Sequence, residues 1–175
     1  MSALEAVALV LIAGLGGSII FYTLLLGSGP VPSNATQIRG VLQALESLDG
    51  SPIYELGAGF GRVAFAVADR FPERRVVGLE RSWVPYLVCR LRLGLTPLPN
   101  LSFRRDDFLK APLGEAKVLL SYVHTGAMAA LASKLQIECR GALLVSHTFG
   151  MRGWEPQSQV TLDDLYRSRV YVYRV

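Results

Sequence analysis

Cysteine and histidine are both scarce in this chain, with two of each among 175 residues. Cys89 and Cys139 lie far apart and neither belongs to a C-x-x-C pair, so no metal or redox site is predicted. Both are expected to be small core residues in a reducing compartment. The sequence also lacks a run of Lys or Arg and an aromatic RNA-binding motif. These absences argue against nucleic acid as a partner, despite a net charge of +4.

Charge itself is missing from residues 6–28, where Leu, Ile, Val, Ala and Gly dominate. This stretch contributes to a mean hydropathy of +0.34, which is high for a soluble domain. About 20 apolar residues in a helix cross a hydrocarbon core of about 30 Å. The sequence therefore predicts a transmembrane helix over residues 6–26, with the membrane as a partner.

Two other interpretations of this stretch are weaker. A cleaved signal peptide begins with basic residues, whereas this chain carries Glu5 and no Lys or Arg before the apolar run. A buried helix in water would be destabilised by the glycines among residues 14–17. All 18 Lys and Arg follow the run, starting at Arg39, which predicts a cytoplasmic C-terminal domain. The expected domains are an anchor over residues 1–29 and a catalytic domain over residues 30–175.

The most informative motif is a glycine loop between a short apolar strand and a helical pattern. Glu55 precedes glycines at alternate positions, namely Gly57, Gly59 and Gly61. A dinucleotide-binding loop has the spacing G-x-G-x-x-G, whereas this loop has G-x-G-x-G. That spacing, with the acid before it, is typical of class I methyltransferases that use S-adenosylmethionine (SAM). The alternative is a glycine-rich turn that binds nothing.

Strands and helices alternate after the N-terminal stretch, which predicts a doubly wound, mostly parallel sheet. The last two strands read as an antiparallel pair, because the second alternates Val and Tyr. The expected fold is therefore the Rossmann-like α/β fold of class I methyltransferases, with seven strands and a terminal antiparallel hairpin. Helices are expected over residues 33–48, 62–70, 86–93 and 127–135, and strands over 53–56, 75–79, 101–105, 117–122, 141–147, 159–162 and 169–174.

Acidic residues follow two of the predicted strands, at the sheet edge where such folds bind ligands. Glu80 ends the second strand, where a carboxylate accepts both ribose hydroxyls of SAM. Asp106 and Asp107 follow the third strand, where an acid accepts from the adenine amino group. We favour Asp107, because Phe108 then supplies an apolar contact to adenine. The loop and the two acids together predict a SAM site.

A narrower likeness rests on three segments of the sequence: Val31-Pro32-Ser33, the loop Glu55–Arg62, and the stretch from Val145-Ser146-His147 to Gly153-Trp154-Glu155-Pro156. They resemble a group of protein-lysine methyltransferases with an archaeal, soluble branch and a mitochondrial branch. The mitochondrial members carry an N-terminal hydrophobic segment and modify the ADP/ATP carrier or the ATP synthase c-subunit. The resemblance implies a protein-lysine acceptor. One departure is Phe60, where these relatives usually have Asp.

Residues that shape the acceptor site are expected after the fourth and fifth strands. The candidates are Tyr122, His124, Ser146, His147 and Trp154. Three of them also have ordinary structural interpretations: His124 as a solvated loop histidine, His147 as a hydrogen-bonded core histidine and Trp154 as a lid over the core. The Asn/Asp-Pro-Pro-Tyr motif of amino-group methyltransferases is absent, so the amine acceptor is implied by the resemblance alone.

The sequence thus predicts a membrane-anchored, SAM-dependent methyltransferase that acts on a lysine of a protein near the membrane. Methylation of a membrane-soluble quinone or lipid is a second possibility, and a SAM-binding scaffold without catalysis is a third. Intact Glu80 and Asp107 argue against the scaffold, because a site without a ligand has no use for them.

Overall fold

The computed structural model describes residues 33–175 and, before them, residues 2, 4–7, 9, 13–14 and 16–17. The chain divides into two units, Met1–Val31 and Pro32–Val175. The second unit holds all the helices and strands considered below. The domain boundary predicted at residue 30 lies outside the described residues.

The predicted transmembrane helix needs correction. Most of residues 6–26 lie outside the described residues, and no helix among the described residues is long and apolar enough to cross a membrane. A charge-free run predicts a span only where it forms one helix of about 20 residues. Hydropathy measures how side chains partition and does not measure helix length. The predicted single-pass membrane location is therefore wrong. The predicted cytoplasmic orientation and membrane partner depended on that span and lose their support.

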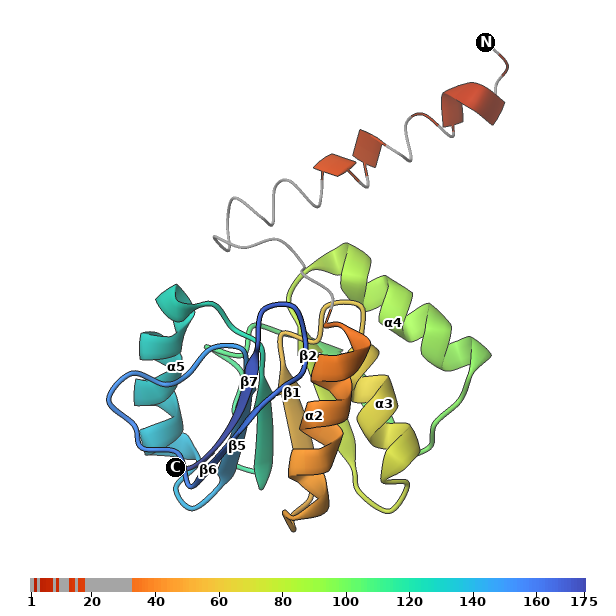
Figure 1. Ribbon diagram of the computed structural model, residues 1–175. Helices are drawn as coiled ribbons and strands as arrows, with labels where there is room; N and C mark the ends of the chain where they lie inside the picture. Colours follow the sequence, from red (N-terminus) through yellow and green to blue (C-terminus); the bar gives the residue numbers. More distant parts are fainter. Residues whose placement is uncertain (1, 3, 8, 10–12, 15, 18–32) are drawn as a thin grey trace. The chain divides into compact units, whose positions relative to one another are not determined.

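Seven strands form one sheet in the order β3-β2-β1-β4-β5-β7-β6 (Figure 1). Neighbouring strands from β3 to β5 pair in parallel, and β7 pairs antiparallel with both β5 and β6. This confirms the predicted sheet and its terminal antiparallel pair. The strands are β1 (Ile53–Leu56), β2 (Val76–Glu80), β3 (Leu101–Arg105), β4 (Val118–Ser121), β5 (Leu143–His147), β6 (Ser158–Thr161) and β7 (Arg169–Arg174).

Helices cover both faces of this sheet (Figure 1). Three of them pack on one face: α2 (Ala35–Glu46), α3 (Arg62–Arg70) and α4 (Trp83–Leu95). The opposite face is covered by α5 (Thr125–Glu138) and by the segment between β3 and β4. Asn34 begins α2 with a capping box, because its side chain accepts from the Gln37 N–H while the Gln37 side chain accepts from the Asn34 N–H.

The sheet is buried on both faces, as the apolar strands predict. All residues of β1, β2, β4 and β5 are buried. Cys89 and Cys139 are free and buried, as expected of small core residues. The strand order reverses at β1, which pairs with β2 on one side and with β4 on the other. Ligands of such sheets bind at the carboxyl ends of the strands beside this switch point.

Candidate functional site

The glycine loop joins β1 to α3 at the switch point, and its backbone requires glycine. Gly57, Gly59 and Gly61 have φ values of 77°, 53° and 76°, a region that other residues rarely adopt. A Cβ on Gly61 would lie 2.9 Å from both the Cys89 sulfur and the Phe103 ring, so this glycine is needed for packing. A Cβ on Gly59 would meet no atom within 4 Å. The open side of the loop is therefore at Gly59, where a ligand can approach the backbone.

Glu55 lies behind the loop and supports it. Its carboxylate accepts the Ala64 N–H at 2.9 Å, which satisfies a free donor in the first turn of α3. Burial raises the pKa of Glu55 to about 8, although the bond from Ala64 opposes this shift and the charge of Glu80 adds to it. The side chain is therefore mainly protonated at neutral pH. The structure places Glu55 against α3, and its predicted contact with a cofactor stays a prediction.

Glu80 ends β2 and holds the outer edge of the loop. Its Oε2 accepts the Gly59 N–H at 2.8 Å, and its Oε1 accepts the Ser82 N–H at 2.6 Å. Each oxygen of a carboxylate can accept two hydrogen bonds, so each keeps one acceptor position. A buried carboxylate with two remaining positions beside an open glycine loop fits a ligand with two neighbouring hydroxyls.

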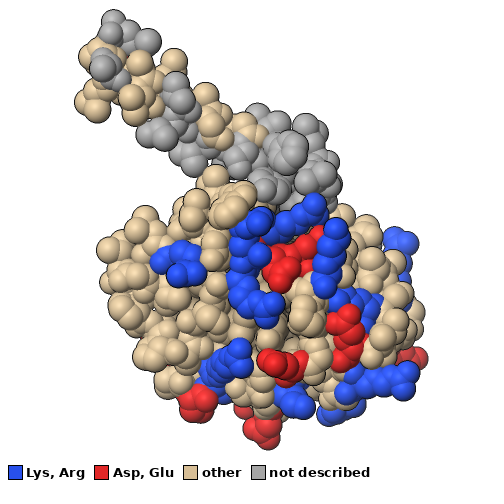
Figure 2. Space-filling model, turned by 180° about the vertical axis from the view of Figure 1, so that it is seen from behind, with Lys and Arg blue, Asp and Glu red and all other residues tan. Residues whose placement is uncertain are grey.

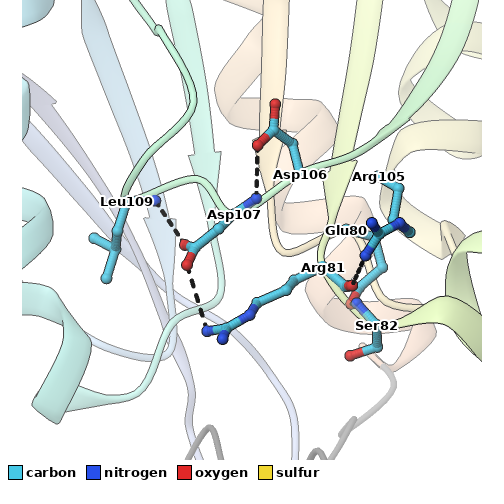
Figure 3. A network of polar contacts seen from close by, with 7 residues as sticks. All are labelled: Glu80, Arg81, Ser82, Arg105, Asp106, Asp107 and Leu109. Carbon is cyan, nitrogen blue, oxygen red and sulfur yellow. Dashed lines mark hydrogen bonds and ion pairs between the residues drawn. The ribbon is translucent and has the colours of Figure 1, made fainter.

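Asp106 and Asp107 follow β3 in different environments (Figure 3). Asp107 accepts the Leu109 N–H at 3.0 Å and pairs with Arg81 at 3.4 Å, and its side chain is 18% exposed. Asp106 pairs with Arg104 at 3.2 Å, and its side chain is 33% exposed. Asp107 is thus the more enclosed of the two.

Phe108 lies next to the loop. A Cβ built on Gly57 would be 3.9 Å from a carbon of the Phe108 ring. The apolar wall expected beside Asp107 therefore faces the first glycine. The adenine contacts of Asp107 and Phe108 stay a prediction.

On the other side of the switch point, two predicted acceptor-site residues come together. The rings of Tyr122 and His147 stack with centroids 4.3 Å apart and planes inclined by 18°. Phe149 stacks on Tyr122 at 5.8 Å. Burial lowers the pKa of His147 to about 4, so its imidazole is neutral at pH 7. Its Nδ1 is buried without a hydrogen-bond partner among the described residues.

The other predicted acceptor-site residues have structural contacts. His124 caps α5, because its Nδ1 accepts the Gly126 N–H at 3.1 Å. Trp154 packs edge-on against Tyr173, with centroids 6.1 Å apart, and is not part of the Tyr122 stack. Ser146 donates to the Phe149 carbonyl at 2.6 Å. The structure thus brings Tyr122 and His147 into contact. Trp154 contacts Tyr173 instead, and His124 caps α5.

The sequence analysis did not identify three further residues at this end of the sheet. Ser121 ends β4 with a buried hydroxyl that has no partner among the described residues. Its only signal is a serine that closes an apolar strand. Gln37 is buried in α2, and its amide donates to the Thr148 hydroxyl at 3.4 Å. Thr148 follows β5 directly and has a φ of 74°, which is a strained value for a β-branched residue. No sequence pattern indicates the last two.

Comparisons with known proteins agree with this geometry. Residues 55–158 match the model of a family described as the ANTKMT methyltransferase domain. The chain is 27% identical over 151 residues to a protein-lysine N-methyltransferase of Saccharolobus islandicus (strain REY15A). This match covers 82% of this chain and 91% of that protein.

Solved structures are also similar. A crystal structure of an RNA methyltransferase from Salinibacter ruber with S-adenosyl-L-homocysteine has a TM-score of 0.72 and 26% identity, and the match covers 83% of this chain and 94% of the other. The structure of P. horikoshii TYW2 with MeSAdo has a TM-score of 0.64 at 11% identity, covering 83% and 64%. The second likeness shows the fold alone.

Proposed function

The chain belongs to the ANTKMT methyltransferase domain family, and on that premise we propose that it methylates the ε-amine of lysine in a protein. It has the class I methyltransferase fold and is a SAM-dependent methyltransferase. The observation that carries the lysine assignment is the likeness to the Saccharolobus protein, which extends over nearly the whole length of that protein.

The cofactor is assigned to the loop side of the switch point. Glu80 receives the ribose hydroxyls, because its two oxygens each keep one acceptor position beside the loop. Asp107 and Phe108 receive adenine, supported by the enclosure of Asp107 and by the position of the ring against Gly57. The open backbone at Gly59 lies where the ligand passes the loop. Glu55 keeps α3 and the loop in place from behind.

The acceptor is assigned to the Tyr122–His147 side. When bound, SAM supplies an electrophilic methyl group, and a lysine amine with a reference pKa of about 10.4 reacts only after it has lost a proton. His147 is neutral because of its burial, so it adds no positive charge that would repel a lysine ammonium. Tyr122 is half-buried and presents part of an aromatic ring, which attracts a cation. Both residues are proposed to bind and orient the lysine side chain.

RNA is a second candidate acceptor, and the likeness to the Salinibacter enzyme favours it. The absence of an RNA-binding motif or a run of basic residues in the sequence argues against it. The predicted quinone and lipid acceptors depended on the membrane anchor and lose that support.

Labelled SAM separates these acceptors. Purified enzyme is incubated with extract from cells that lack it, and the label is followed into protein, RNA and lipid fractions. We expect the label in protein and, after acid hydrolysis, in methylated lysine. Gly59→Arg, which places a long cation at the open side of the loop, is the control without activity. Label confined to RNA or to lipid contradicts the proposal.

A further inference from the structure

One segment of the chain has an unusual charge. Residues 81–105, between Glu80 and Asp106, contain no Lys, Asp or Glu, and all their charge comes from arginine. The arginines are Arg81, Arg90, Arg92, Arg104 and Arg105. Helix α4 occupies the first half of this segment and β3 ends it. Figure 2 shows basic side chains gathered around a small acidic cluster, beside a broad area of uncharged surface.

Helix α4 also exposes apolar side chains in a stripe, which we call the α4 face. Leu91 is 66% exposed and Leu95 is 75% exposed. Four of its five residues follow one another at intervals of four along the helix, as neighbours on one surface do. The residues of the α4 face are Trp83, Leu87, Val88, Leu91 and Leu95. A contiguous apolar surface of this kind on a folded domain marks an interaction site more often than isolated apolar residues do.

The arginines around the α4 face are held by aromatic rings. Arg105 lies over the Trp83 ring at 4.0 Å, and Arg92 lies over the Phe65 ring at 3.9 Å. Arg90 donates to the Tyr86 hydroxyl at 3.1 Å. Within residues 33–175, these three guanidinium groups pair with no carboxylate, whereas Arg81 and Arg104 do. Stacking fixes a guanidinium and leaves its N–H groups ready for an external acid.

We propose that the α4 face docks the methyl acceptor through an apolar and acidic surface on that protein. Charge selects this partner, because Arg90, Arg92 and Arg105 lie on or beside helix α4 without a carboxylate partner among residues 33–175, and residues 81–105 contain no acid. Composition agrees, since Trp and Arg are enriched and Lys is depleted at the core of protein interfaces. The chain's own residues 6–28 carry no charge, so they do not complement the arginines.

The position of α4 connects such docking to the active site. The Ser82 N–H, at the start of α4, donates to Glu80 at 2.6 Å. On the inner side of the helix, the Cys89 thiol donates to the Gly59 carbonyl at 3.2 Å. A protein held on the outer side is therefore one helix away from the glycine loop. This inference rests on the proposed function in one respect, namely that the docked protein is the acceptor.

The test uses the full chain and a synthetic helical peptide as the probe. The peptide carries leucines at intervals of four, glutamates beside them and one lysine near its end. We compare Leu91→Glu with Ile137→Glu, an exposed apolar residue on α5 that is 77% exposed. Leu91→Glu should raise the Kd and the KM of the peptide about tenfold and leave kcat and SAM affinity unchanged. Ile137→Glu should change none of these values.

Two comparisons complete the test. A peptide with glutamine in place of glutamate should bind about tenfold more weakly than the acidic peptide. A short lysine peptide without leucine or glutamate should be methylated equally by wild type and Leu91→Glu. Equal binding of the acidic peptide to wild type and Leu91→Glu would overturn the proposal. The proposal would also be overturned if vesicles of phosphatidylcholine and phosphatidylserine bound more strongly than the acidic peptide and lost that binding in Leu91→Glu. A wild-type dimer that Leu91→Glu dissociates would overturn it as well.

Methylation of lysine and docking at the α4 face can be contradicted by different results. If no peptide is methylated but Leu91→Glu abolishes binding, the docking surface stands and the lysine assignment fails. If the short peptide is methylated and Leu91→Glu binds the acidic peptide normally, the lysine assignment stands and the docking surface fails.

Discussion

Single residues at the strand ends divide into those that we propose contact the ligand and those that hold the loop in place. We propose both roles for Glu80, because it binds the loop and keeps acceptor positions free. Glu55 is buried behind the loop and is tied to α3. Both carboxylates are buried, so their hydrogen-bond partners distinguish the two roles: the Ala64 N–H for Glu55, and the N–H groups of Gly59 and Ser82 for Glu80.

Glu80→Ala should weaken SAM binding by about 1.5–3 kcal/mol, the range for hydrogen bonds to a charged group. The loss includes both the ribose contacts and the support of Gly59. Isothermal titration measures it. Asp106→Ala is the matched control, because this acid is only partly buried, pairs with Arg104 and should leave affinity nearly unchanged. Unchanged affinity in Glu80→Ala would remove this residue from the site.

Glu55 should make stability depend on pH. Its pKa is raised from 4.5 to about 8, so the folded state keeps a proton that the unfolded chain releases. The free energy of unfolding should therefore fall as pH rises through this window. Glu55→Gln stays neutral and can still accept from Ala64, so it should be more stable than wild type near pH 8 and nearly equal to it near pH 4.5. Urea unfolding at several pH values measures the difference. A difference that does not change with pH would show that Glu55 is ionised in the folded protein.

His147→Ala should reduce turnover and leave SAM affinity nearly intact, because the residue lies on the acceptor side in this account. The change removes the ring that supports Tyr122. His147→Phe separates the two roles of the imidazole, since it keeps an aromatic ring and removes Nδ1. Steady-state kinetics with a lysine peptide measure both. Equal loss of SAM affinity and turnover would place His147 at the cofactor instead.

At the scale of elements, the loop and the helices around it depend on close packing. A Cβ on Gly61 would meet side chains of α4 and β3, whereas a Cβ on Gly59 would meet no atom within 4 Å. The two glycines have similar φ values but different surroundings.

Gly61→Ala should therefore destabilise the fold more than Gly59→Ala. Both changes put a Cβ at positive φ, which costs about 1 kcal/mol. Only Gly61→Ala also brings that Cβ to 2.9 Å from Cys89 and Phe103, and overpacking adds about 1–3 kcal/mol. Thermal unfolding compares the two variants. Equal destabilisation would indicate that α4 moves to make room at little cost.

The elements also show how far sequence patterns reach. The bounds of β1 and β3 are those predicted, because turn residues flank both strands. Helix α4 begins at Trp83 and not near residue 86, since Pro85 lies in the first turn, where its missing N–H costs nothing. Helix α5 extends from 125 to 138 because His124 caps it and Gly126 is tolerated in its first turn.

Across the whole molecule, local patterns predicted the fold and the residues around the glycine loop more readily than the contacts of Tyr122 and His147. The glycine loop and its acids follow strands in sequence, so topology alone brings them together. The stack of Tyr122 on His147 and the contact of Gln37 with Thr148 join residues far apart in the chain, and only packing reveals them. The predicted membrane span is wrong, since no helix among the described residues is long and apolar enough to cross a membrane. An apolar run in a sequence does not by itself specify a spanning helix.

Mass spectrometry of acceptor proteins measures whether this chain methylates protein lysine. Proteins from cells without the enzyme are incubated with SAM and either wild type or Gly59→Arg, then digested into peptides. We expect methyl groups on lysine ε-amines that appear only with wild type. Methylation found with wild type only on RNA or on small molecules, with no change at any lysine, would contradict the proposed lysine methylation.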